Sequence, residues 1–291
     1  MTSTLLDYGA SIECSVGPHG LTPLHLAVST RSEDLVKLLL ERGANPMARL
    51  RRASTEACCQ PELDGGETVL HTAITTVKTA LLPLLLAAGV NVSSEGIYLG
   101  RTPLHVAASR GDEATARMLL DAGADISAWC YDGRTPLHLA AEHGRVGVIK
   151  LLLGRAADAM ATTPDGQTPL SLAASGGKEE AMSVLLRQTS DVLTVGQKAT
   201  VMISAAKGGS LDVVELLVRE GFSVNACDEK SQFSALEAAA VHSHEAVVIF
   251  LLRNGATPNA SAIRASSQIS QGSIRGLLDG TLPLPPGSPV K

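Results

Sequence analysis

The sequence predicts an all-α solenoid in which pairs of short helices stack one on the next. Three observations predict it. A Thr-Pro-Leu-His motif recurs, with complete copies that begin at Thr22, Thr102 and Thr135. Degenerate copies of the motif begin at Thr68, Thr168, Thr200 and Ser234. Apolar residues at helical spacing follow the copies, and only 2% of the chain is aromatic although 45% is hydrophobic, which suits small, closely stacked helices.

Each repeat is expected to contain two helices of two to three turns. In residues 132–158, Thr135 can cap a first helix, and Pro136 occupies its first position, where no amide hydrogen bond is lost. That helix can end at Gly144, and a second helix is expected at about 146–153. Helices this short are unstable alone in water, so the array must fold as a unit by stacking its repeats.

The period near 33 and the tetrapeptide resemble the ankyrin repeat. The second-helix endings agree with one another, as in Leu-Leu-Leu-Glu-Arg-Gly at 38–43 and Leu-Leu-Leu-Ala-Ala-Gly at 84–89. The resemblance covers about residues 5–259, as seven repeats after a half repeat at 5–10. It implies antiparallel helix pairs with projecting β-turn fingers. It also implies a concave surface of fingertips and first helices that binds a partner protein.

The spacing also predicts how the chain is divided. The step from Thr22 to Thr68 is 46 residues long, about 13 residues longer than the repeat period. We expect a partial N-terminal repeat with the first finger at 1–21, the repeat array at 22–260 with an inserted loop at about 46–65, a helix that could cap the array at 261–280, and a disordered Pro-rich tail at 281–291.

The inserted loop contains a motif for modification. Arg51 and Arg52 precede Ser54, and two arginines at this spacing suit the acidic pocket of a basophilic kinase. The alternative is a solvated basic loop in which the motif arises by chance. Cys58 and Cys59, in the same loop, have no His or acidic residue at metal-binding spacing and are expected to be surface thiols.

The tail carries two further short motifs. Pro283 and Pro286 form a minimal P-x-x-P, and Ser288 is a second phosphorylation candidate because a proline follows it. For both motifs we favour an inert linker.

Departures from the repeat predict local irregularity. Pro83 falls well inside a second helix and should kink or shorten it. Glycine ends most second helices, where a left-handed residue is favoured, but Ala156 and Thr189 fill that place in two repeats. Proline and histidine are both lost in the copy at Thr200. We therefore expect a soft joint between about residues 158 and 208.

Aromatic residues on two successive fingers are the candidate partner-binding residues. Stacking should bring Tyr98 beside Trp129 and Tyr131, and such side chains anchor protein interfaces. The alternative is that they pack on neighbouring fingers and cover the flank of the array. The ends of two first helices could extend the patch through Arg110, Glu142 and His143.

The sequence predicts no catalytic residue, cofactor or metal site. The resemblance assigns the recurring histidines a structural role, in which they bond to backbone in adjoining turns: His25, His71, His105 and His138. A net charge of −5 without long blocks of like charge argues against nucleic acid, and no apolar run is long enough to span a membrane. Five cysteines without ligand spacing suggest reduced thiols, and hence an intracellular protein in the cytoplasm or nucleus.

Two functions follow from these observations. The first is a non-enzymatic scaffold or adaptor that binds a partner protein through its finger and first-helix surface. The alternative is a regulatory or targeting region of a larger multidomain enzyme or channel. The half repeat would leave the apolar sides of Leu24 and Leu26 uncovered, which also suggests self-association at the N-terminal end.

Overall fold

The computed structural model describes residues 10–17, 19–50, 68–76, 79–96, 99–228, 233–259, 262–263 and 272–285. The described residues form helices and isolated β-bridges but no strands, so the predicted all-α class is confirmed. The chain divides into two compact units. One contains Met1–Leu139 with Lys150–Ala157, and the other contains Ala140–Ile149 with Asp158–Lys291.

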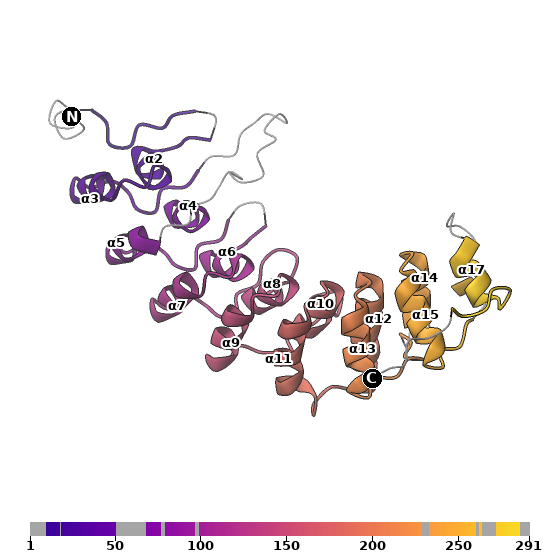
Figure 1. Cartoon of the computed structure of the whole chain (residues 1–291). Helices are drawn as coiled ribbons and strands as arrows, with labels where there is room; N and C mark the ends of the chain where they lie inside the picture. The colour runs from indigo at the N-terminus through magenta and orange to yellow at the C-terminus, as the bar shows by residue number, and fades with distance from the viewer. Residues whose placement is uncertain are drawn as a thin grey trace. The chain divides into compact units, whose positions relative to one another are not determined.

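The first unit is built of helix pairs. The pairs are α2 (Pro23–Ser29) with α3 (Glu33–Glu41), α4 (Val69–Thr75) with α5 (Leu82–Ala87), and α6 (Pro103–Arg110) with α7 (Glu113–Asp121). The first helix of each pair packs beside the next, α2 against α4 and α4 against α6 (Figure 1). Their leucines at the motif position are fully buried in the core: Leu24, Leu70 and Leu104. The expectation that Leu24 is uncovered is therefore wrong, whereas Leu26 is 39% exposed.

The element boundaries expected for residues 132–158 are confirmed by α8 (Pro136–Glu142) and α9 (Val146–Gly154). The complete motif also works as expected in α6, where Thr102 is the N-cap, Pro103 the first residue, and Gly111 the left-handed C-cap with φ 82°. The local sequence therefore determines where these first helices begin.

Pro83 shortens its helix, as predicted, but it lies in the first turn of the helix and not in its interior. A 3-10 turn, η1 (Thr79–Leu81), precedes α5, which has only six residues. Pro83 is the second residue of α5, where its missing N–H would have no intrahelical acceptor. The proline therefore sets where the helix starts and causes no kink.

The second unit is also built of helix pairs. Its helices are α10 (Pro169–Ser175), α11 (Glu179–Thr189), α12 (Val195–Gly208), α13 (Leu211–Arg219), α14 (Ala235–Val241), α15 (Glu245–Arg253) and α17 (Gly272–Leu278). Helix α12 packs against both α10 and α14, and α17 packs against α15 (Figure 1). Three apolar side chains of α17 are buried, and capping of the array by this helix remains a prediction: Ile274, Leu277 and Leu278.

Unlike the complete copies of the motif, the degenerate copy at Thr200 does not start a helix. Helix α12 spans 14 residues and begins earlier, where Thr194 and Gln197 form a capping box. The Thr194 hydroxyl accepts a hydrogen bond from the Gln197 N–H at 3.2 Å. Thr200 lies inside the helix and donates its hydroxyl to the Gly196 carbonyl at 3.1 Å.

The longer α12 explains why the preceding repeat has Ser171 in place of histidine. In a complete repeat, such as that of His105, the imidazole bonds to the carbonyl at the base of the next finger. Residues 190–193 instead link α11 almost directly to Thr194, without a finger. A histidine at position 171 would therefore have no finger carbonyl to bond.

The two residues that replace a helix-ending glycine behave differently. Ala156 takes the left-handed conformation, with φ 62°, as the repeat predicts. Thr189 does not, because α11 continues through it to a C-cap at Ser190 with φ −50°. The Thr189 hydroxyl donates to the Leu185 carbonyl at 2.9 Å. Because Thr189 is helical, it does not carry the strain of a β-branched residue in the left-handed conformation.

The soft joint remains a prediction, and the missing finger gives it a location. We expect the backbone amides of residues 190–193 to exchange faster than those of α6 and α7, because a short link replaces a finger there. Hydrogen exchange followed by mass spectrometry at neutral pH measures this. Equal protection of peptides from 158–208 and from 101–153 would contradict the prediction.

Several predicted features lie outside the described residues and remain predictions. They are the start of the half repeat at 5–9, the candidates Ser54, Tyr98 and Ser288, and the thiols Cys58 and Cys59.

Candidate interaction surface

Two neighbouring fingers of the first unit carry the candidate surface. In the first finger, the Gly96 N–H donates to the Arg101 carbonyl at 2.9 Å. In the second, the Cys130 N–H donates to the Arg134 carbonyl at 3.0 Å, and the Gly133 N–H to the Cys130 carbonyl at 2.8 Å. Local hydrogen bonds thus close each finger into a tight turn.

Buried histidines anchor the bases of both fingers. Nε2 of His71 lies 2.9 Å from the Arg101 carbonyl oxygen, and Nε2 of His105 lies 3.0 Å from that of Arg134. Nδ1 of His105 accepts from the backbone N–H of Thr102 at 3.1 Å, so the network assigns the imidazole hydrogen to Nε2. Burial lowers the pKa of both histidines to about 4, so both are neutral at pH 7.

The tips of the two fingers are joined at Tyr131. Its N–H donates to the Leu99 carbonyl at 2.9 Å, and its ring lies against Gly100. A Cβ at Gly100, which has φ 62°, would overlap the ring. Three large apolar side chains nonetheless remain exposed on these fingers, with exposed fractions of 47% for Leu99, 49% for Trp129 and 65% for Tyr131.

The second finger is stabilised by a small polar network. Cys130 is buried, and its thiol donates to a carboxylate oxygen of Asp132 at 2.8 Å. Burial, together with Asp132, raises the pKa of Cys130 to about 11, so it is a protonated thiol. Burial opposes ionisation of Asp132, but the Cys130 hydrogen bond and the Arg134 charge hold its pKa below the ordinary value. Arg134 Nε lies 3.3 Å from this carboxylate.

The structure brings together only part of the predicted patch. Trp129 and Tyr131 lie on the joined fingers, and α6 begins directly after the first of these fingers. Arg110 is exposed at the other end of α6, and an eight-residue helix is about 12 Å long. Arg110 therefore lies at the far end of α6 from its capping residue Thr102, and its part in the patch remains a prediction. Glu142 and His143 belong to the second unit, where Nδ1 of His143 lies 4.0 Å from a Glu142 carboxylate oxygen.

Sequence reasoning did not single out Arg101 as a candidate. Its backbone carbonyl anchors His71, and its side-chain charge is felt in the second finger. Its charge acts on both Cys130 and Asp132. In the sequence it is only the residue before a helix cap, and Arg134 occupies the equivalent place one repeat later.

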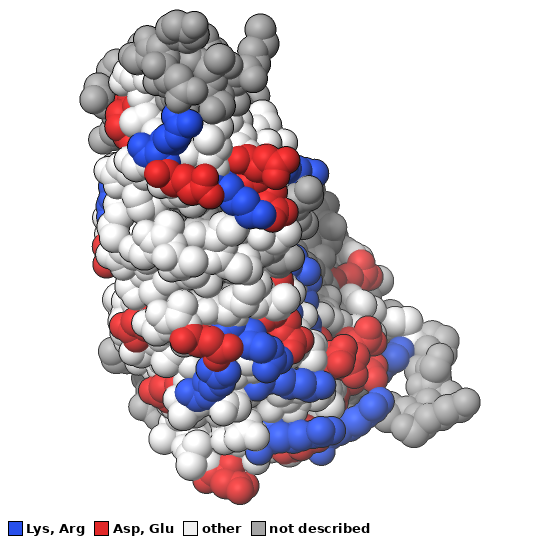
Figure 2. Space-filling view, turned by 90° about the vertical axis from the view of Figure 1, so that its left-hand side faces the viewer, with Lys and Arg blue, Asp and Glu red and all other residues white. Residues whose placement is uncertain are grey.

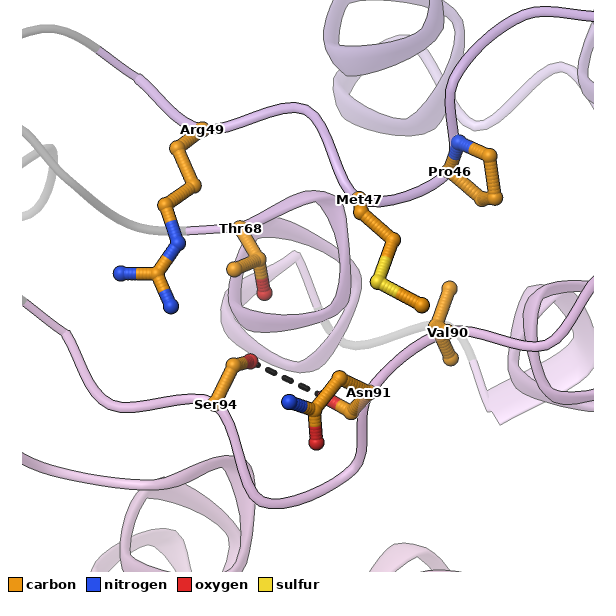
Figure 3. Close-up of a pocket in the computed structure, with 7 residues that line it drawn as sticks. All are labelled: Pro46, Met47, Arg49, Thr68, Val90, Asn91 and Ser94. Atoms are coloured by element: carbon orange, nitrogen blue, oxygen red, sulfur yellow. Dashed lines mark hydrogen bonds between the residues drawn. The ribbon is translucent and has the colours of Figure 1, made fainter.

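A shallow hollow elsewhere on the first unit is a weaker candidate. Seven residues line it: Pro46, Met47, Arg49, Thr68, Val90, Asn91 and Ser94. Figure 3 shows the turns that follow α3 and α5 around it, with the Ser94 hydroxyl bonded to the Asn91 carbonyl at 3.0 Å. The hollow holds about 290 Å³, including open solvent, which falls below the usual range for a small-molecule pocket.

Positive and negative side chains are mixed on the face of the molecule shown in Figure 2. On the face in Figure 2, acidic and basic side chains lie next to one another, and an uncharged band separates two such groups. The described residues contain no cluster of three or more His, Cys, Asp or Glu that could hold a metal ion. None of the helices described is long and apolar enough to cross a membrane.

Stacked helix pairs with joined, exposed fingers define a repeat protein with an extended surface for protein recognition. The family described as "Ankyrin repeats (3 copies)" matches residues 53–130, 70–163, 127–196 and 191–262. The single "Ankyrin repeat" matches residues 19–50. The chain belongs to the ankyrin-repeat family, and its repeats form a protein–protein interaction module.

The chain is also similar to parts of longer proteins. It is 34% identical over 134 residues to the mouse B-cell lymphoma 3 protein homolog, a match that covers 38% of this chain and 30% of that protein. It is 33% identical over 135 residues to the chicken nuclear factor NF-kappa-B p105 subunit, covering 38% and 14%. It is 32% identical over 110 residues to the Arabidopsis thaliana E3 ubiquitin-protein ligase KEG, covering 36% and 6%. The chain thus spans less than a third of each relative.

Proposed function

We propose that this chain is a non-enzymatic scaffold or adaptor that holds a partner protein against its fingers and first helices. Leu99, Trp129 and Tyr131 carry this proposal, because they are exposed on two hydrogen-bonded fingers. Large aromatic side chains fixed on rigid turns lose little conformational entropy when a partner covers them, and they dominate the binding energy of many interfaces.

The alternative, in which these side chains only cover the flank of the array, is less consistent with their exposure. Tyr131 packs on Gly100, yet 65% of its surface remains exposed, and about half of Trp129 is exposed as well. A partner that covered both side chains would remove this apolar area from water.

Replacing Trp129 and Tyr131 together by alanine is expected to weaken partner binding at least about tenfold, because two interface anchors are lost. The partner is first isolated on the immobilised wild-type chain, identified by mass spectrometry, and then titrated as purified protein by calorimetry. Helical circular dichroism and the thermal midpoint should change little, because both side chains are largely exposed.

Val195→Ala is the matched control, since Val195 is 84% exposed and belongs to the second unit, whereas the fingers belong to the first. It should bind like the wild type. If the double variant also binds like the wild type, the finger surface is not the interface.

The second candidate function is a regulatory or targeting region of a larger protein. It is favoured by the similarity to short stretches of long proteins, among them a ubiquitin-protein ligase of which the match covers 6%. An intracellular location, in the cytoplasm or nucleus, and self-association at the N-terminal end remain predictions.

A further inference from the structure

The finger surface contains a partly exposed arginine, Arg101, one of whose donors has no acceptor. Nε of Arg101 is buried, and no acceptor among the described residues lies within hydrogen-bonding distance. A buried donor without a partner is unfavourable, and a guanidinium presents its donors in a planar fork that matches a carboxylate.

The acidic group on which the Arg101 charge acts, Asp132, already has partners. Asp132 accepts from the Cys130 thiol and pairs with Arg134, so its carboxylate is held within its own finger. Arg101 and Arg134 carry two positive charges against the single negative charge of Asp132, which leaves these three side chains with an excess of one positive charge. The first finger adds Glu95, whose backbone carbonyl accepts from Arg49 at 3.2 Å, and this pair contributes one charge of each sign.

Apolar surface lies directly beside this excess positive charge. Arg101 follows Leu99 and Gly100 in the chain, and the Tyr131 ring lies on Gly100. The Arg101 charge acts on Cys130, which stands between Trp129 and Tyr131 in the second finger. One surface therefore combines a partly exposed arginine with three exposed apolar side chains.

We propose that the surface formed by Leu99, Arg101, Trp129 and Tyr131 recognises an acidic segment of a partner protein, in which an Asp or Glu stands beside a large apolar residue. The partner carboxylate accepts hydrogen bonds from the Arg101 guanidinium, and the apolar side chain covers the tyrosine and tryptophan rings. This inference rests on the proposed function and specifies its partner.

Trp129 is the only tryptophan in the chain, so its fluorescence reports on the site without a label. The full chain is titrated with four synthetic peptide pools that share Leu and Phe at the same positions. The remaining positions hold Asp and Glu, Asn and Gln, Lys and Arg, or phosphoserine. We expect the acidic pool to change Trp129 emission at about tenfold lower concentration than the amide pool, because the carboxylate makes charged hydrogen bonds. This advantage should shrink at high salt.

Arg101→Gln should remove the preference for the acidic pool, so that the acidic and amide pools change Trp129 emission at similar concentrations. Arg117→Gln is the control, because Arg117 is an exposed arginine on α7 that pairs with Glu113 at 2.7 Å, and this variant should keep the preference. Circular dichroism checks that both variants are folded.

The outcomes separate this inference from the proposed function. If all pools bind equally and Tyr131→Ala weakens them all, the finger surface still binds proteins but the acidic preference is wrong. A preference that survives in Arg101→Gln, or a stronger preference for the phosphoserine pool, also overturns the carboxylate assignment. If no pool changes Trp129 emission, both the inference and the finger interface are wrong.

Discussion

Acidification from pH 6.5 to 4 is expected to lower the free energy of unfolding by about 3 kcal/mol for each of His71 and His105. Burial lowers the pKa of both imidazoles from 6.5 to about 4 in the folded chain. Below pH 6.5 the unfolded chain binds protons that the folded chain does not yet bind, so stability falls as the pH falls. The loss is complete near pH 4, where the folded histidines also titrate.

The hydrogen-bond network supplies a second reason for this acid sensitivity. Nδ1 of His105 accepts from Thr102, so a proton on Nδ1 would face a donor and break the cap of α6. Asp132 also has a lowered pKa, but its contribution is lost below its ordinary value of 3.8, outside this pH range. Urea unfolding followed by circular dichroism at several pH values between 4 and 7 measures the effect.

A variant with glutamine at both positions is the control for this prediction. Thr194 and Gln197 show that glutamine can complete the same capping box in this chain. The His71→Gln, His105→Gln variant should be less stable at pH 7, because the bonds to the Arg101 and Arg134 carbonyls are weakened or lost. Its stability should vary much less between pH 6.5 and 4, and an unchanged pH dependence would show that other groups cause the acid sensitivity.

Gly208→Ala is expected to destabilise the chain by about 2 kcal/mol, although alanine is the better helix former. Gly208 is the last residue of α12, and a Cβ there would overlap the carbonyl oxygen of Ser175 at the end of α10. Helices α10 and α12 pack directly on each other, so the overlap can be relieved only by moving one backbone against the other.

Gly154→Ala is the matched comparison, because Gly154 is the last residue of α9. No atom of the described residues lies within 4 Å of a Cβ built there. Alanine should therefore raise the free energy of unfolding by about 0.5 kcal/mol, since it restricts the unfolded chain. Urea unfolding of both variants gives the comparison, and equal effects at the two positions would show that the contact with Ser175 is not limiting.

Much of the fold could be predicted because short-range sequence features specify the repeat. Thr102 and Pro103 act on the helix that directly follows them, and the period places equivalent helices side by side. At Thr200 the period does not coincide with a helix start. The capping box of Thr194 and Gln197, which can be recognised in the sequence, starts α12 instead. Helix α11 likewise continues through Thr189, because residues 190–193 link it to α12 without a finger.

The candidate site could be predicted only in part. The sequence shows that Trp129 and Tyr131 fall on a finger, because finger position follows from the period. Their joining to Leu99 and Gly100 depends on contacts between residues about 30 positions apart, as does the lack of an acceptor at Arg101. One chain's sequence contains no direct record of such contacts.

For this protein, the one-dimensional order of residues was sufficient for the repeat, its helix starts and its class as an interaction module, because caps, turns and period act over a few residues or by simple repetition. Which side chains stay exposed, which carboxylate is already bonded, and which glycine lies against a neighbouring backbone became known only in three dimensions. Those properties depend on the close packing of one repeat against the next, where displacements of about an ångström decide whether atoms bond or overlap.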